Sequence, residues 1–272
     1  MSLKIGILGW PLTKTLSPSI HNILAEFSSV DLVYEKLPVE NLSAEKLDDI
    51  HTKYDGYNVT IPHKRKIYDL IKSKDCSNIT ELAQGTQAVN TVVLKNSIIH
   101  ATNTDIEGIK KTFESINYDL RNKKILILGN GGSTQTFNYF CDSSNEVIIV
   151  SRQKGEDTKL YSEILNLVPE IQVLINTTPI GMPPFEDELL PVPYELFENL
   201  ELFFNFGYKT NSKLTEGFSQ NVQSIDGITM LIGQAISSFN LWTGQEIKFD
   251  HVYHEILERL NNENQIPDSR AN

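Results

Sequence analysis

The chain has 272 residues, of which 40% are hydrophobic and 22% charged, so it can build the core of one large or two modest globular domains. Its formal net charge of −11 argues against a nucleic-acid partner, because binding a phosphate backbone requires clustered Lys and Arg. Its two cysteines match no disulfide framework or metal-binding spacing, and no apolar run approaches the roughly 20 residues of a membrane span. We therefore expect a cytoplasmic protein with neither a metal nor a membrane contact.

The first hundred residues alternate strand-like and helix-like segments. Strands are predicted over residues 4–8, 32–37 and 56–62, followed by an antiparallel pair over 88–94 and 97–101. Helices are predicted over residues 18–27, 43–54 and 63–73. Ser17 is the expected N-cap of the first helix, with Pro18 at its first position.

The second part of the chain repeats the alternation with longer apolar runs. A helix over 105–116 leads into predicted strands over 125–128, 147–150, 173–175 and 202–205. We expect a helix near 159–167 and a proline-rich loop over 179–193. A long apolar helix over 227–242 and an amphipathic helix over 250–261 complete the pattern.

The apolar run Ile125–Leu128 ends in a glycine-rich turn that leads into a helix-like segment. Such a strand, turn and helix N-terminus form an anion cradle, because glycine lets the backbone approach a pyrophosphate and the first helical N–H groups point at it. An ordinary corner without a ligand is the alternative explanation. The predicted cofactor-binding residues are those of the turn and of the ends of later segments: Gly129, Asn130, Gly131, Gly132, Ser133, Ser151, Arg152, Thr177 and Gly227.

These elements predict an α/β protein with two domains. Residues 1–104 form an α/β substrate-binding domain, completed by C-terminal helices over about 240–272 that pack back on it. Residues 105–239 form a Rossmann-type nucleotide-binding domain. Because ligands bind beyond the carboxyl ends of strands in open α/β sheets, we expect the site in a cleft between the halves, with closure about a hinge.

Polar side chains follow the predicted strands of the first half. They are hydroxyls, amides, one ammonium and one carboxylate, a set that suits a small polyol carrying a carboxylate. Taken singly, each has an ordinary explanation as a turn former, a helix cap or a solvated charge. The set comprises Thr15, Ser17, Asn58, Thr60, Lys64, Asn90, Thr91, Asn103 and Asp105.

Seven segments in order resemble the shikimate/quinate dehydrogenase family over nearly the whole chain. In one-letter code they are LSPSIHN (16–22), NVTIPHK (58–64), AVNT (88–91), NTDIEG (103–108), GNGG (129–132), NTTPIGM (176–182), and MLIGQA with WTG (230–235 and 242–244). Any one of them would be a weak signal, whereas seven in family order are specific.

The resemblance implies reversible reduction of 3-dehydroshikimate to shikimate with NADPH, within aromatic amino-acid and chorismate biosynthesis. It makes Lys64 and Asp105 the catalytic pair. An ammonium within reach of the substrate oxygen can stabilise its developing negative charge and supply a proton, and a carboxylate can position that ammonium. The implied substrate ligands are Thr15, Ser17, Asn58, Thr60, Asn90, Gln234 and, nearby, Tyr208. His21 and His63 are read as structural, and the family includes monomers and homodimers.

The end of the second strand of the nucleotide-binding half favours NADP over NAD. NAD-binding units usually carry an acidic residue there, to bind the ribose 2′-hydroxyl. This chain has Ser151 and Arg152 instead, and no carboxylate follows before Glu156. Arg152 can pair with a 2′-phosphate; a plain surface arginine is the alternative.

Several positions depart from the family pattern. Lys14-Thr15 replaces the usual His-Ser, Gln87 replaces a glycine, and the usual Asp-x-x-Tyr-x-Pro segment reads Asn205-Phe-Gly-Tyr208-Lys-Thr210. Because the catalytic pair is intact, an active dehydrogenase is expected. Two alternatives stay open: a quinate/shikimate paralogue with a relaxed substrate or cofactor range, and a non-catalytic nucleotide-sensing relative.

Overall fold

The computed structural model describes residues 2–12, 15–155, 157–208 and 212–263. Three positions discussed above, Lys14, Glu156 and Thr210, lie outside the described residues. The chain forms two compact units. The first unit comprises Met1–Gly108 and Leu231–Asn272, and the second unit comprises Ile109–Met230. Each is described by itself.

The first unit is built on a six-stranded mixed sheet with the order β2-β1-β3-β5-β6-β4. β1 pairs in parallel with β2 and β3, and β5 pairs antiparallel with β3 and β6. Asn58 lies opposite Thr91 in the register of β3 and β5, which brings two of the predicted polar positions together. The strands are β1 (Leu3–Gly9), β2 (Leu32–Pro38), β3 (Gly56–Val59), β4 (Ser77–Ile79), β5 (Thr91–Lys95) and β6 (Ile98–Thr102).

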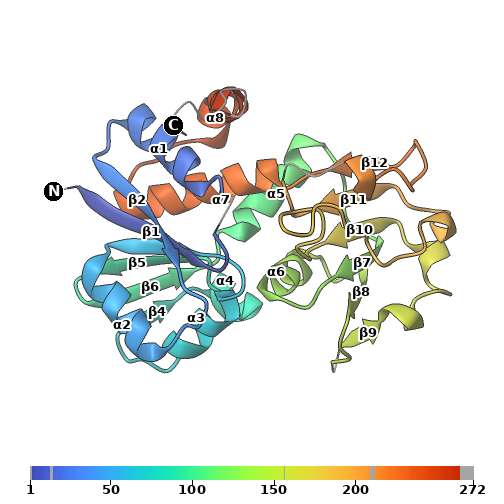
Figure 1. Ribbon diagram of the computed structural model, residues 1–272, viewed down its shortest axis with the longest axis horizontal. Coiled ribbons are helices and arrows are strands. Elements are labelled where there is room, and N and C mark those ends of the chain that lie inside the picture. The colour runs from blue at the N-terminus through green and yellow to red at the C-terminus, as the bar shows by residue number, and fades with distance from the viewer. Residues whose placement is uncertain (1, 13–14, 156, 209–211, 264–272) are drawn as a thin grey trace. The chain divides into compact units, whose positions relative to one another are not determined.

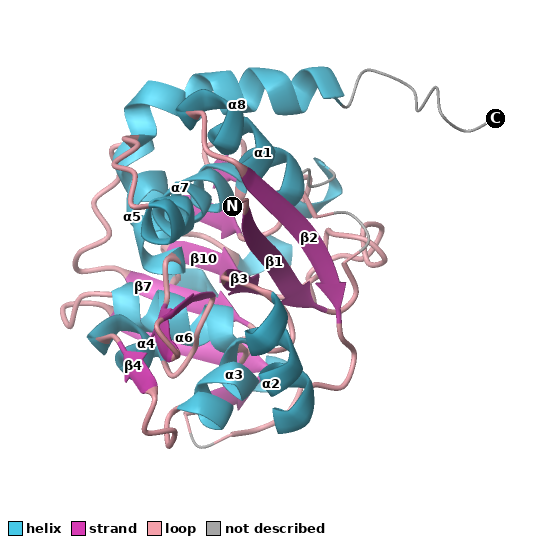
Figure 2. Cartoon of the chain, turned by 90° about the vertical axis from the view of Figure 1, so that its left-hand side faces the viewer, coloured by secondary structure: helices cyan, strands magenta, loops and turns pink. Residues whose placement is uncertain are grey.

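Helices cover both faces of this sheet, with α1 and α8 on one side and α2 and α3 on the other (Figure 1). Figure 2 shows α1, α7 and α8 together beside β1 and β2. Leu47 of α2 and Ile67 of α3 pack on the sheet residues Leu8 and Val59, whereas Trp242 of α7 packs against Ile5. The helices are α1 (Ser17–Ser28), α2 (Ala44–Lys53), α3 (Lys64–Ile71), α4 (Glu81–Thr86), α5 (Asp105–Ser115), α7 (Ile228–Thr243) and α8 (Phe249–Glu263).

Side-chain caps start two helices of this unit. The Ser43 hydroxyl caps α2 by accepting from the Lys46 N–H, and the Thr80 hydroxyl caps α4 by accepting from the Ala83 N–H. The predicted capping role of Ser17 is wrong, because α1 begins at Ser17 itself and Leu16 occupies the N-cap position without a side-chain cap. The Ser17 hydroxyl is therefore not committed to the helix end.

The second unit is a six-stranded, fully parallel sheet with the order β12-β11-β10-β7-β8-β9. Counted from β7, this is the 3-2-1-4-5-6 order of dinucleotide-binding folds, with the switch point between β7 and β10. The short 3₁₀ helices span Tyr161–Glu163, Val168–Glu170, Tyr194–Leu196 and Ser212–Leu214. The strands and the α-helix are β7 (Lys124–Leu128), α6 (Gly132–Phe140), β8 (Glu146–Ser151), β9 (Thr158–Leu160), β10 (Val173–Asn176), β11 (Leu202–Asn205) and β12 (Gln223–Ile225).

The central strands of the second unit are buried on both faces, as near-continuous apolar runs require. Ile125 and Ile127 pack with Phe137 of α6 and Phe113 of α5, while Leu126 and Leu128 face the opposite core. This packing holds the β7–α6 turn at the carboxyl edge of the sheet.

Two parts of the fold differ from the sequence prediction. The helix expected near 159–167 is wrong: residues 158–160 form β9, which pairs with β8, and a 3₁₀ turn follows. The elements β4, α4 and β12 have no counterpart among the predicted segments. Within the described residues, no helix has the length and apolar character that crossing a membrane would need.

Candidate functional site

Lys64 and Asp105 form a buried ion pair in the first unit. Lys64 is the first residue of α3, and its Nζ donates to Asp105 Oδ2. Their side chains are only 12% and 6% exposed, so water screens the pair weakly. Asp105 is the first residue of α5, where the Asn103 Oδ1 accepts its backbone N–H at 3.2 Å. The first residues of α3 and α5, 41 positions apart in the sequence, are thus in direct contact.

Asn90 holds the other oxygen of this carboxylate. Its Nδ2 donates to Asp105 Oδ1 at 2.8 Å and to the Thr104 hydroxyl at 3.0 Å. Its Oδ1 accepts from the Thr104 backbone N–H at 2.7 Å. The Asn90 amide is therefore fixed at both ends, and the Asp105 carboxylate is held between an ammonium and an amide.

Gln234 reaches the same cluster from α7. Its Oε1 lies 3.4 Å from Asn90 Nδ2, and its Nε2 donates to the Leu231 carbonyl at 2.8 Å. One turn later, the buried Ser238 hydroxyl donates to the Gln234 carbonyl at 2.9 Å. The helical spacing of these two residues could have identified Ser238, which the sequence prediction missed.

The Asn58 side chain makes most of its hydrogen bonds within the protein. Its Oδ1 accepts from the Tyr34 hydroxyl at 2.7 Å, and its Nδ2 donates toward the Thr91 and Ser238 hydroxyls at 3.1 and 3.0 Å. Most of the hydrogen-bonding capacity of Asn58 therefore orders the site. Tyr34 was not predicted, since nothing in the sequence joins it to Asn58.

His21 lies beneath this part of the site, fully buried and stacked on the Tyr34 ring at 4.3 Å. Burial lowers the pKa of His21 to about 3, and the nearby Asn58 side chain opposes that shift only in part. Burial likewise raises the pKa of Tyr34 well above its ordinary value, with the Ser17 side chain acting in the opposite direction. Both rings are thus neutral supports, in line with the structural role read for His21.

Three hydroxyl-bearing residues predicted to bind substrate also lie in the first unit. The Thr15 hydroxyl donates to Ser17 Oγ at 3.2 Å, and the Ser17 N–H donates back to Thr15 Oγ1 at 3.3 Å. Thr60 follows β3, where its N–H donates to the Leu8 carbonyl at 2.9 Å. The two hydroxyls of Thr15 and Ser17 form a compact donor pair of the kind that binds a carboxylate.

The glycine turn of the second unit has the shape that a pyrophosphate needs. Gly129 follows β7 with φ +118°, and a Cβ there would meet the Thr177 hydroxyl at 2.5 Å, so only glycine fits. Gly131 is the N-cap of α6, and a Cβ at this position would meet nothing within 4 Å. The backbone is therefore open in front of a nine-residue helix whose first N–H groups lack intrahelical partners.

Thr177 and Gly227 hold the surrounding backbone. The Thr177 hydroxyl donates to the Leu128 carbonyl at 2.8 Å and lies 2.7 Å from the Thr134 hydroxyl, which ties the turn to the end of β10. A Cβ at Gly227 would come within 2.2 Å of the Phe206 carbonyl oxygen. Thr177 and Gly227, both predicted to bind the cofactor, thus lie where two backbone segments come close together.

Ser151 and Arg152 stand at the end of β8, next to the glycine turn in the parallel sheet. The Ser151 hydroxyl donates to the Gln153 carbonyl, and the Arg152 side chain is exposed. The Arg152 guanidinium lies at the exposed edge of this site.

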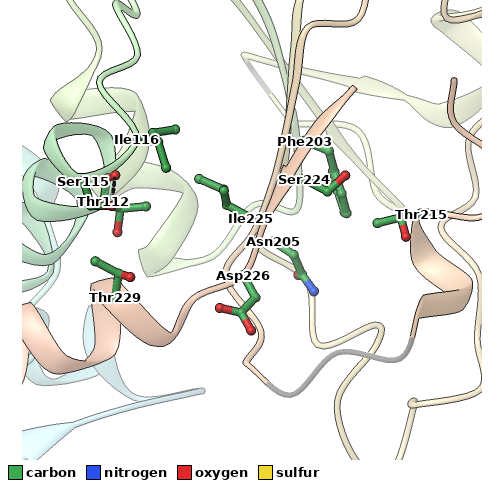
Figure 3. A pocket seen from close by; sticks show the side chains of 10 residues that line it. All are labelled: Thr112, Ser115, Ile116, Phe203, Asn205, Thr215, Ser224, Ile225, Asp226 and Thr229. Atoms are coloured by element: carbon green, nitrogen blue, oxygen red, sulfur yellow. Dashed lines mark hydrogen bonds between the residues drawn. The ribbon is translucent and has the colours of Figure 1, made fainter. Parts of the chain in front are cut away.

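The second unit also contains a cavity of about 430 Å³ beside β12. Figure 3 shows its lining side chains, among them Asn205 at the end of β11 and Asp226 after β12. The Asn205 Oδ1 accepts from Asn176 Nδ2 at 2.9 Å, whereas its buried Nδ2 has no hydrogen bond to a described residue. None of the predicted site residues lines this cavity; Tyr208, predicted near the substrate, follows β11 in the same unit.

The donor set of the two units suits organic ligands. Among residues 2–12, 15–155, 157–208 and 212–263, no cluster of three His, Cys, Asp or Glu side chains could hold a metal ion. The first unit offers an ammonium, a carboxylate, amides and hydroxyls, which can polarise and protonate a carbonyl oxygen. The second unit offers a glycine turn, a helix N-terminus and an arginine, which can bind a phosphorylated nucleotide.

Comparison with known proteins agrees with both halves of this description. Residues 7–92 match the model of the shikimate dehydrogenase substrate binding domain, and residues 227–257 match that of the shikimate 5'-dehydrogenase C-terminal domain. The chain is 31% identical to the shikimate dehydrogenase (NADP(+)) of Prochlorococcus marinus strain MIT 9515, over 94% of this chain and 96% of the relative. It is 30% identical to the enzyme of the same name from Caldanaerobacter subterraneus subsp. tengcongensis, over 92% and 95%.

A solved structure gives the same result for the fold. The crystal structure of shikimate dehydrogenase 1 from Peptoclostridium difficile superposes with a TM-score of 0.82 at 28% identity, covering 94% of this chain and 98% of that one. Each of these alignments covers nearly the full length of this chain and of the protein compared with it. The chain therefore belongs to the shikimate dehydrogenase family.

Proposed function

We propose that this protein catalyses the reversible, NADPH-dependent reduction of 3-dehydroshikimate to shikimate. The observation that carries the proposal is the buried Lys64–Asp105 pair with Asn90 on its second oxygen. Family membership supplies the substrate class, because the curated relatives are named shikimate dehydrogenase (NADP(+)).

Lys64 is the proton donor in the direction of reduction. When bound, NADPH supplies a hydride to the carbonyl carbon. The negative charge that develops on the substrate oxygen is then stabilised by the Lys64 ammonium, which transfers a proton from Nζ to that oxygen. The neutral amine is reprotonated by water, and in the oxidation direction the same Nζ accepts the proton.

Asp105 and Asn90 keep the ammonium in place. A carboxylate beside an ammonium restrains the flexible lysine side chain. Because Asn90 donates to Asp105 Oδ1, the carboxylate presents Oδ2 to Lys64. This fixed arrangement lowers the reorganisation that proton transfer requires.

The remaining polar side chains orient the substrate. Thr15 and Ser17 would donate to its carboxylate, and the Gln234 amide would contact a ring hydroxyl. Thr60, Asn58 and Tyr208 are the further ligands that the family pattern implies. NADP(H) would lie on the Gly129–Ser133 turn, with Arg152 at the 2′-phosphate. A cytoplasmic location and a monomer or homodimer complete the proposal.

Absorbance at 340 nm tests this function. Shikimate and quinate are each offered to purified protein with NADP⁺ and with NAD⁺. Reduction of NADP⁺ by shikimate alone is the expected result. Turnover of quinate or a preference for NAD⁺ would point to a paralogue of broader range, and NADPH binding without turnover in any combination would point to a nucleotide-sensing relative.

A further inference from the structure

Three buried hydroxyls from distant parts of the chain meet below the proposed catalytic pair. They belong to Thr91 at the start of β5, Thr104 just before α5, and Ser238 on α7. The oxygen–oxygen distances are 3.1 Å for Thr91–Thr104, 2.8 Å for Thr91–Ser238 and 3.0 Å for Thr104–Ser238. All three residues are buried, so this hydroxyl triangle is protected from competition by bulk water.

Each hydroxyl of the hydroxyl triangle has an acceptor for its proton within the cluster. Each hydroxyl carries one proton. Ser238 gives its proton to the Gln234 carbonyl at 2.9 Å, and Thr91 gives its proton to Asn90 Oδ1 at 2.9 Å. The Thr104 hydroxyl accepts from Asn90 Nδ2 at 3.0 Å, and it lies 3.0 Å from the Ser238 hydroxyl and 3.1 Å from Asn90 Oδ1, to either of which it can donate.

The Asp105 carboxylate and the Thr104 backbone N–H fix which end of the Asn90 amide faces Asp105, and the Thr104 hydroxyl adds a hydrogen bond to Nδ2. Asn90 Nδ2 has two protons, which go to the Thr104 hydroxyl and to Asp105 Oδ1. A reversed amide would place Oδ1 against the Asp105 carboxylate, and two acceptors in a buried site repel each other. It would also give up the 2.7 Å hydrogen bond from the Thr104 N–H.

We propose that Thr104 is a positioning residue whose hydroxyl holds the Asn90 amide in the place from which its Nδ2 reaches Asp105. It thereby keeps Asp105 Oδ2 directed at Lys64. This inference rests on the proposed function, which it deepens by assigning a role to a side chain that belongs to neither the catalytic pair nor the substrate ligands. Thr104 acts through Asn90 and does not contact the reacting atoms.

Two substitutions separate the hydroxyl of Thr104 from its shape. Thr104→Val keeps the branched shape and loses the hydrogen-bonding oxygen, whereas Thr104→Ser keeps the oxygen and loses the methyl group. We expect kcat for shikimate oxidation to fall about tenfold in the Val variant, the upper range for one neutral buried hydrogen bond, and to stay within about threefold in the Ser variant. The KM for NADP⁺ should be unchanged in both, because the predicted nucleotide residues are in the second unit.

A double-mutant cycle tests whether Thr104 acts through Asn90. In an Asn90→Ala background, adding Thr104→Val should lower kcat by less than twofold, because the amide to be oriented is absent. A further tenfold loss in that background would overturn the inference. So would a Val variant with wild-type kcat, or a Ser variant as slow as the Val variant.

The same experiment distinguishes this inference from the function on which it rests. Wild-type protein that fails to reduce NADP⁺ with shikimate refutes both. Wild-type turnover combined with an unaffected Val variant refutes the role of Thr104 alone. Thermal unfolding of each variant, followed by tryptophan fluorescence, confirms that the rates come from folded protein.

Discussion

Replacing Lys64 by Met separates two consequences of the buried ion pair. The substitution keeps a long unbranched side chain and removes the ammonium from a site where only 12% of the lysine side chain is exposed. Asp105, 6% exposed, keeps its hydrogen bond from Asn90 and loses its countercharge. We therefore expect the substitution to lower both kcat and the free energy of unfolding. A second substitution, at Asp105, should restore only the stability.

The role and the burial of the pair set the expected size of the loss in kcat and of the loss in stability. Positioned proton transfer contributes about 10²- to 10⁴-fold, so kcat should fall by that factor, about 2.7–5.5 kcal/mol of transition-state stabilisation. Leaving a buried charge without its partner costs about 3–5 kcal/mol of unfolding free energy. Adding Asp105→Asn removes the orphaned charge, so the double variant should recover most of the stability and none of the kcat.

Tryptophan fluorescence suits the stability measurement, because both tryptophans of the chain, Trp10 and Trp242, lie in the first unit with the ion pair. Lys72→Met is the matched control. It breaks an ion pair with Asp69 on an exposed surface, where such pairs contribute at most about 1 kcal/mol. The control should retain wild-type kcat and unfold almost normally.

Two results would refute this reasoning. A Lys64→Met variant with kcat within tenfold of wild type would remove Lys64 from the proton-transfer step. A double variant no more stable than Lys64→Met would show that an unpaired buried Asp105 is not the source of the stability loss.

Two further predictions concern the nucleotide and the buried histidine. Arg152→Ala should raise the KM for NADP⁺ by about tenfold or more and leave the KM for NAD⁺ unchanged. The control Arg121→Ala, which breaks an exposed ion pair with Asp119, should change neither KM. Equal effects on both cofactors would remove Arg152 from the 2′-phosphate site. His21 has a folded-state pKa of about 3, below its unfolded value of 6.5, so the unfolded state binds the proton first and stability is lost as the pH falls below 6.5. From pH 6.5 to 4.5 this residue should remove roughly 2–3 kcal/mol of unfolding free energy, and His21→Leu should flatten the acid limb of denaturant-unfolding midpoints; an unchanged pH slope would show that His21 is not the group responsible.

The sequence predicts the main elements of the fold because most are long and strongly periodic. The apolar runs of β7 and β10 and the long α7 lie where their patterns place them. The segment around Leu160 to Leu167 misleads, because its apolar spacing suits a helix while pairing of Thr158–Leu160 with β8 decides the outcome. β4 and β12 are three residues each, too short to produce a periodic signal.

The candidate site shows the same division between local and long-range information. The motifs name Lys64, Asp105 and Asn90, and the structure brings their side chains together. The sequence does not reveal that Tyr34 holds Asn58, nor that hydroxyls of β5, of α7 and of the residue before α5 converge, because those contacts join residues 13 to 180 positions apart. Such neighbours follow only from the packed fold.

The most direct test of the central claim is the initial rate of NADPH consumption when wild-type protein is given 3-dehydroshikimate, with the product identified by NMR. The account predicts one molecule of shikimate formed for each NADPH oxidised. Folded protein that binds NADPH and consumes none of it with this ketone would contradict the account.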